Sequence, residues 1–112
     1  MKLLRAVFRP FKLDEVKDAL AQEGVTGLTC SEVKGYGRQR GTPETYRGAP
    51  LATEFVPKIA IDAVVPDALV QPALTALERV LRTGKVGDGK IFVSHVEEAT
   101  RVRTGDRGDT AV

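Results

Sequence analysis

The chain has 112 residues, enough for one domain that buries roughly 65% of its unfolded surface. Hydrophobic residues make up 42% and charged residues 29%, as in soluble globular proteins, and the net charge of +2 does not require a nucleic acid or an anionic membrane as partner. The single cysteine, Cys30, excludes an internal disulfide, favours a reducing compartment and is expected to be buried. The opening apolar run is too short for a signal peptide, and no stretch has the roughly 18 apolar residues of a membrane span, so we expect a cytoplasmic protein.

The chain opens with a predicted strand and helix. Residues 2–9 form the strand, which ends at Pro10 because proline cannot donate to a ladder. Residues 12–23 form the helix, which Gly24 ends. The apolar face of this helix consists of Leu13, Val16 and Leu20.

The same order of elements then repeats. Residues 26–33 form a second strand, and residues 59–65 alternate as a third strand before Pro66. A second helix covers residues 67–81, and a last strand covers residues 91–96. The order βαββαβ predicts an α+β, ferredoxin-like domain over residues 1–112.

Both faces of the predicted strands are rather apolar, yet two helices can cover only one face of a four-stranded sheet. An apolar second face predicts a homo-oligomer whose sheets face inward. The alternative is a sheet with some exposed alanine and valine.

Residues 38–54 form a long polar segment between the middle strands, with no helical or strand period. A loop this long in a compact domain is usually functional or disordered. We expect a mobile interaction loop; the alternative is a plain disordered insertion.

Residues 82–90, RTGKVGDGK, alternate glycine with lysine. Glycine allows backbone N–H groups to approach a ligand, and lysine supplies positive charge, so the run suits a phosphate. It nearly matches a P-loop, but Ile91 replaces the hydroxyl residue that holds Mg²⁺, and a helix precedes the run where a P-loop has a strand. The alternative is a flexible turn between helix and strand.

The tail, residues 101–112, is polar and charged. If residues 99–103 are extended, Arg101 and Arg103 lie on one side and could clamp phosphate oxygens. The alternative is a solvated terminus. His95 alternates with apolar residues on the last strand and is expected to be packed or interfacial.

Taken together, these segments resemble the PII signal-transduction proteins, a nitrogen-regulatory family, over nearly the whole chain. The resemblance is carried by RPFKLDEVKDAL (9–20), EVKGYGRQRG (32–41), TYRGA (45–49), FVPK (55–58), RTGKVGDGKIFV (82–93) and RVRTGDRG (101–108). It implies a homotrimer with clefts between subunits, in which ATP and ADP compete. It also implies that MgATP creates a site for 2-oxoglutarate. The ligands would set the long loop, which docks on an ammonium channel or on nitrogen-assimilation enzymes.

The resemblance also implies roles for individual residues. The nucleotide would be held by Thr29, Gly37, Arg38, Val64, Gly87, Asp88, Gly89, Lys90, Arg101 and Arg103. The residues expected to bind 2-oxoglutarate are Gln39, Lys58 and Gly87, and Gln39 would also hold Mg²⁺ through its amide oxygen. Lys58 would pair with the far carboxylate.

The chain departs from the family pattern at the loop tip. Leu51 stands where many bacterial relatives carry a nucleotidylated tyrosine, and Ala49 stands where some photosynthetic relatives carry a phosphorylated serine. We therefore expect control by ligands rather than by either covalent switch.

Two other classes of function are less favoured by the sequence. An enzyme, either a slow ATPase or a small phosphatase, is disfavoured because the sequence shows no residue pair resembling a general base beside a nucleophile. An RNA-binding module on the same fold would read bases with surface aromatics, but the last strand offers only Phe92 and the charge is nearly balanced. The sequence therefore predicts a regulator that is not an enzyme, with no nucleic-acid partner and with membrane contact only through a channel.

Overall fold

A computed structural model of the chain describes residues 1–37, 45–46, 49–50 and 55–112. Its elements, in chain order, are β1 (Lys2–Phe8), the 3-10 helix η1 (Pro10–Lys12), α1 (Leu13–Gln22), β2 (Thr29–Gly35), β3 (Thr45–Tyr46), β4 (Ala49–Pro50), β5 (Val56–Val65), α2 (Asp67–Leu81), β6 (Lys90–His95) and the 3-10 helix η2 (Gly108–Ala111).

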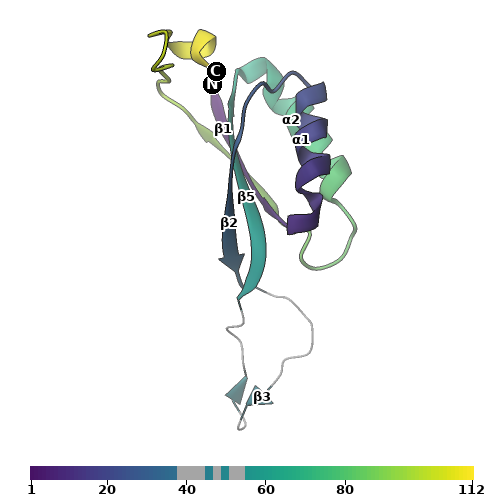
Figure 1. Cartoon of the computed structure of the whole chain (residues 1–112). Helices are drawn as coiled ribbons and strands as arrows, with labels where there is room; N and C mark the ends of the chain where they lie inside the picture. Colours follow the sequence, from purple (N-terminus) through teal and green to yellow (C-terminus); the bar gives the residue numbers. More distant parts are fainter. Residues whose placement is uncertain (38–44, 47–48, 51–54) are drawn as a thin grey trace.

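Four strands form one antiparallel sheet in the order β2-β5-β1-β6. The two helices lie side by side on the same face of this sheet, and the two chain ends lie close together at one end of it (Figure 1). This arrangement confirms the predicted α+β, ferredoxin-like βαββαβ fold.

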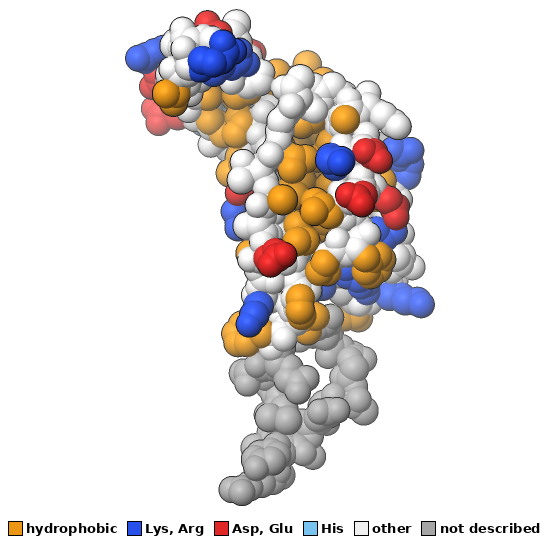
Figure 2. All heavy atoms as spheres, viewed as in Figure 1, with side chains coloured by type: hydrophobic (Ala, Val, Ile, Leu, Met, Phe, Trp, Pro, Cys, Tyr) orange, Lys and Arg blue, Asp and Glu red, His pale blue; other side chains and the backbone are white. Residues whose placement is uncertain are grey.

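The core lies between the sheet and the helices. Alternate residues of β1 point toward the helices, so that Leu4, Ala6 and Phe8 are fully buried. They pack with Leu20 of α1 and Leu77 of α2. Apolar side chains gather along this seam between the layers (Figure 2). The period-2 pattern of the strands and the 3.6-residue pattern of the helices thus meet in one cluster.

Most element boundaries agree with the sequence to within one residue, and the larger differences are in β2, which begins at Thr29 rather than at residue 26, and in β5. Helix α2 has the predicted bounds, whereas β5 begins at Val56, before the predicted residue 59. Pro57 pairs with Lys34 of β2 at a point beyond β1, whose pairing with β5 ends at Ile59. Among the strands that the structure describes, only β2 pairs with this part of β5, so that the other side of β5 is an edge there, and an edge tolerates a proline without an N–H.

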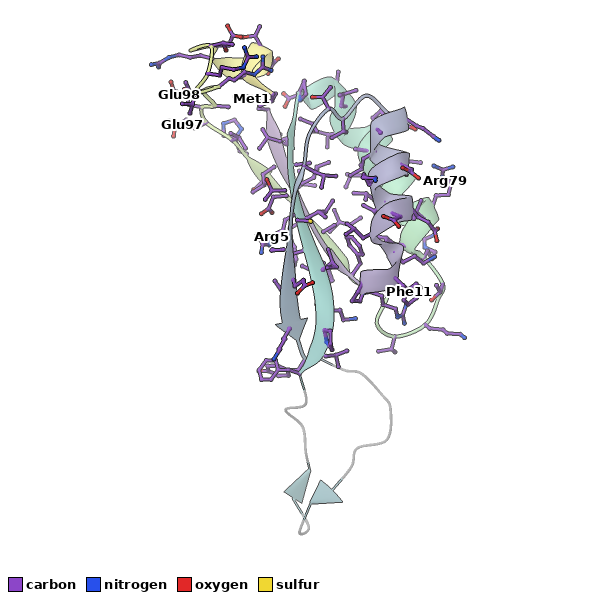
Figure 3. All side chains as sticks on the ribbon, viewed as in Figure 1. Met1, Arg5, Phe11, Arg79, Glu97 and Glu98 are labelled. Carbon is purple, nitrogen blue, oxygen red and sulfur yellow. The ribbon has the colours of Figure 1, made fainter. Side chains whose placement is uncertain are left out.

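The second face of the sheet, which the helices leave open, is mixed rather than uniformly apolar. Leu3, Val7 and Val64 lie half-buried on it. Arg5 and Asp62 form an ion pair on the same face, 3.0 Å from nitrogen to oxygen, and Arg5 points away from the helices (Figure 3). The open face therefore combines apolar side chains with two opposite charges that neutralise one another.

Two details of the prediction were wrong. Cys30 is exposed, because β2 is an edge strand, although its register partner Ile61 is fully buried. Within the segment expected to lack strands, β3 and β4 pair in a two-residue antiparallel ladder. The predicted interaction loop otherwise lies outside the described residues. Among the helices that the structure describes, none is long and apolar enough to cross a membrane.

Candidate functional site

The glycine-lysine run links α2 to β6, as the sequence predicted. It lies at the end of the sheet where β1 finishes, beside η1 and Phe11 (Figure 3). Gly84, Gly87 and Gly89 all have positive φ angles, between 83° and 105°. We call residues 83–90 the glycine loop.

Asp88 organises the glycine loop from within. Its carboxylate accepts hydrogen bonds from the backbone N–H of Thr83 at 2.7 Å, from the N–H of Gly84 at 2.9 Å and from the Thr83 hydroxyl. The bonds from Thr83, together with those from Arg9 and Gly84, hold the pKa of Asp88 well below its usual range. The acid is therefore charged at neutral pH, and its charge is directed at donors of the protein itself.

The physical reason for a glycine differs between two positions of the loop. A Cβ on Gly89 would lie 2.0 Å from the carbonyl oxygen of Val7, so the loop can pack on the β1 backbone only without a side chain there. A Cβ on Gly87 would lie 2.8 Å from a guanidinium nitrogen of Arg9. The sequence attributed these glycines to close approach of a ligand, whereas the structure shows close approach of the protein's own groups.

Lys58 reaches the loop from β5. Its Nζ donates a hydrogen bond to the carbonyl oxygen of Gly87 at 3.0 Å. Partial burial lowers the pKa of Lys58, and the neighbouring Arg9 charge lowers it further, against an opposing effect of Asp88. The loop is thus held to the sheet by two cations, from β5 and from the end of β1.

These groups border a cavity of about 730 Å³. It lies between the end of β2, the middle strands and the glycine loop, and its described lining consists of Val7, Gly35, Tyr36, Gly37, Lys58, Lys85, Val86, Gly87, Asp88, Gly89, Lys90 and Phe92. Three of these residues are lysines, and Val7, Tyr36, Val86 and Phe92 contribute apolar or aromatic side chains. This combination suits a ligand with an anionic part and a flat apolar part.

The structure brings together some of the sequence-predicted site residues and separates others. Around the cavity lie Gly37, Lys58, Gly87, Asp88, Gly89 and Lys90. Thr29 and Val64 lie instead on the open face of the sheet, on the same side as Asp62. Arg38 and Gln39 lie outside the described residues.

Arg101 and Arg103 lie at the opposite end of the sheet from the glycine loop. Lys90 pairs with Val7 at one end of β1, whereas His95 pairs with Lys2 at the other, next to the tail (Figure 1). The six residues of β6 span about 20 Å at ~3.3 Å per residue. The two arginines of one chain therefore do not meet the glycine loop of the same chain.

The tail is also not extended, so that premise was wrong. Residues 102–104 form a turn, closed by a hydrogen bond from the N–H of Gly105 to the carbonyl of Arg101 at 2.8 Å. Arg101 forms an ion pair with Asp106 at 3.6 Å. The turn forms because Thr100 and Arg107 bridge as antiparallel partners, which requires the chain between them to reverse. His95 is exposed rather than packed within the chain.

Sequence reasoning missed Arg9. It was the last residue of a predicted strand and the first of a segment that resembles the family, with no role of its own, although its guanidinium contacts both Asp88 and Val86. Asp88 follows it by 79 positions, so no local pattern pointed to the pair.

Comparisons with known proteins show which proteins this chain is similar to. The family model described as "Nitrogen regulatory protein P-II" matches residues 1–106. The chain is 52% identical to the nitrogen regulatory protein P-II of Rhodospirillum rubrum and 53% identical to that of Rhodobacter capsulatus. It is also 50% identical to the nitrogen regulatory protein P-II 1 of Escherichia coli K12, and each match covers 100% of both chains.

The family match also decides between a regulator and an enzyme. The chain is a regulatory protein and not an enzyme. Because the family model matches residues 1–106 and the chain is 50% to 52% identical to these relatives over its full length, it belongs to the PII family of nitrogen regulatory proteins.

Proposed function

We propose that this nitrogen regulator senses ATP, ADP and 2-oxoglutarate in the cavity beside the glycine loop. The observation that carries the proposal is the convergence of Lys58, Lys85 and Lys90 on a cavity bordered by a positive-φ glycine loop. Ammonium groups and close-packed backbone are suited to phosphate and carboxylate oxygens.

In this proposal the phosphates lie against Gly87, Asp88, Gly89 and Lys90. Asp88 contributes its backbone rather than its carboxylate, because that carboxylate is engaged by Thr83, Gly84 and Arg9. The internal pairing also reduces the repulsion that a free acid would exert on a phosphate. Lys90 supplies positive charge at the point where the loop enters β6.

A neighbouring subunit completes the site. Thr29 and Val64 lie on the open face, and Arg101 and Arg103 follow the far end of β6, whose six residues span about 20 Å, so one chain would not place all of them on one nucleotide. We propose a homotrimer whose sheets face inward, with Thr29 and Val64 at the base and the arginines contributed across the interface. The half-buried apolar residues of the open face support this assembly.

The keto acid would bind next to the phosphates. Lys58 would pair with its far carboxylate, and the backbone of Gly87 would contact it. Gln39, which would also hold Mg²⁺ between the keto acid and the ATP phosphates, lies outside the described residues. Because Mg²⁺ would be held by the ATP phosphates, the keto acid would bind more tightly to the ATP-bound protein. By linkage, the keto acid would raise the affinity for ATP.

Regulation would pass through residues 38–54 to target proteins. These targets would be an ammonium channel or nitrogen-assimilation enzymes, with membrane contact only through such a channel, in a cytoplasmic setting and without nucleic acid. Leu51 in place of tyrosine supports control by ligands without nucleotidylation at the loop tip. Residues 1–112 would act as one such domain.

The test is a calorimetric titration of the full chain. MgATP, ADP and 2-oxoglutarate are titrated separately, and the keto acid is titrated again in saturating MgATP. The proposal predicts nucleotide binding, and keto-acid binding only when MgATP is present. Lys90→Ala should weaken nucleotide binding by about tenfold or more, since a charge-assisted contact contributes about 1.5–3 kcal/mol. Lys17→Ala, on the exposed side of α1, removes the same charge and serves as control.

The outcomes separate the parts of the proposal. Nucleotide binding without any keto-acid binding would retain the energy sensor and reject carbon sensing. Binding of neither ligand would reject the cavity assignment. Steady ATP turnover on the order of 1 s⁻¹ or faster would contradict a regulatory role without catalysis.

A further inference from the structure

Arg9 occupies a position between the sheet and the glycine loop. It follows β1 directly and precedes η1, with an extended backbone (φ −64°, ψ 138°). Its side chain is only 23% exposed. The guanidinium donates to Asp88 Oδ1 at 2.7 Å and to the carbonyl oxygen of Val86 at 2.6 Å. One side chain therefore forms hydrogen bonds with two residues of the glycine loop.

Through Asp88, Arg9 is also connected to the start of the glycine loop. The same carboxylate accepts from the backbone N–H groups of Thr83 and Gly84. Arg9 is thus connected to residues 83–84 through Asp88 and to residue 86 directly. The loop's internal hydrogen bonds and its attachment to the sheet share one acid.

Gly87 fits this arrangement. Its φ is +103°, and a Cβ there would lie 2.8 Å from the same guanidinium nitrogen that donates to Val86. The absence of a side chain makes room for Arg9. A residue that approaches a loop so closely, and meets a glycine at the point of approach, is well placed to define the loop's shape.

Resting on the proposed function, we propose that Arg9 is a positioning residue for nucleotide binding: it holds residues 86–88 in the conformation that receives the phosphates. The planar fork of arginine suits this role, because it can donate to a carbonyl and a carboxylate at once, whereas an ammonium is a single point charge. Pairing with Asp88 also directs the Arg9 charge into the protein, which leaves Lys90 to meet the ligand.

The test measures loop order and affinity separately. Backbone order parameters are recorded by NMR for the full chain without ligand, and MgATP binding is measured by calorimetry. The variants are Arg9→Gln, Arg9→Lys and Asp88→Asn. The control is Arg79→Gln, which removes the same charge from an exposed position on the outer side of α2 (Figure 3).

In Arg9→Gln, the order parameters of residues 86–88 should fall from about 0.85 toward about 0.6, the range of flexible backbone. MgATP affinity should fall by about tenfold, the loss of one charge-assisted contact. Arg9→Lys should recover part of both losses. Asp88→Asn should loosen the same residues, and Arg79→Gln should match the wild type.

Unchanged order in Arg9→Gln would overturn the proposal, even if affinity falls, because Arg9 would then act on the ligand through its charge. If Arg9→Gln does not fold, Arg9→Lys and Asp88→Asn provide the same comparison. Failure of the wild type to bind MgATP would reject the proposed function itself. That outcome is recognised from the wild-type titration alone.

Discussion

The Nζ of Lys58 lies 3.0 Å from the carbonyl oxygen of Gly87, so an ammonium proposed to bind the keto acid is already bonded to the loop proposed to bind phosphate. A dicarboxylate that pairs with Lys58 must share or displace this bond. The position of the glycine loop and the occupancy of the keto-acid site would therefore depend on one another, which is a physical basis for coupling between the two ligands.

Keto-acid binding should depend on pH through Lys58. Its folded pKa is lowered from 10.5, mainly by burial, so the unliganded protein loses this proton at a lower pH than the unfolded chain does. Pairing with a carboxylate requires the ammonium and raises the pKa again. Affinity should therefore be full below the lowered pKa of Lys58 and should fall as the pH rises through it.

Calorimetry in two buffers of different ionisation enthalpy checks the proton balance of this step. Binding of the keto acid at a pH above the lowered pKa of Lys58 should be accompanied by proton uptake. Lys58→Arg, which stays charged throughout, should flatten the pH dependence that Lys58 causes. A pH dependence that is equally steep in Lys58→Arg would assign the titration to another group.

Gly89→Ala should destabilise the protein. The new Cβ would lie 2.0 Å from the Val7 carbonyl oxygen, and the φ of +105° is unfavourable for alanine, so we expect a loss of about 2–4 kcal/mol in the free energy of unfolding. Gly27→Ala is the matched control, since nothing lies within 4 Å of its Cβ. It should change stability by less than about 1 kcal/mol.

Urea denaturation of both glycine variants, at one protein concentration, gives the comparison. Equal midpoints for Gly89→Ala and Gly27→Ala would show that the loop can move away from β1 at little cost.

Leu3→Arg should disrupt assembly. Leu3 lies half-buried on the open face, beside Val64 in register, and an unpaired guanidinium would be costly in a closed interface. Light scattering should report the mass of three chains for the wild type and of one for the variant. Lys17→Glu on α1 should remain trimeric. A wild type that is monomeric at all concentrations would reject the inward-facing assembly.

Mixed trimers test whether the nucleotide site is shared. Lys90→Ala and Arg103→Ala should each weaken MgATP binding when alone. If Lys90 and Arg103 of one site come from different subunits, co-refolding the two variants restores about one quarter of the sites by random mixing. If both residues come from one subunit, mixing restores none. Binding stoichiometry in the mixture distinguishes the two results.

The amino-acid sequence alone determined the order and type of the main elements. The bounds of α2 followed from its 3.6-residue apolar period, and β1 followed from alternation that ends at Pro10. It also placed the glycine run between a helix and a strand. These are local properties: each depends on residues within a few positions of one another, where side-chain period and turn chemistry act directly.

Only the tertiary structure decided what the residues of the site contact. Arg9 and Asp88 are 79 positions apart, Gly89 is a glycine because Val7 lies beneath it, and β6 separates Arg101 from the glycine loop of its own chain. Such contacts depend on strand register and on how the sheet brings distant segments together. A residue's spacing in sequence therefore predicts its element, while its partners are set by packing over the whole fold.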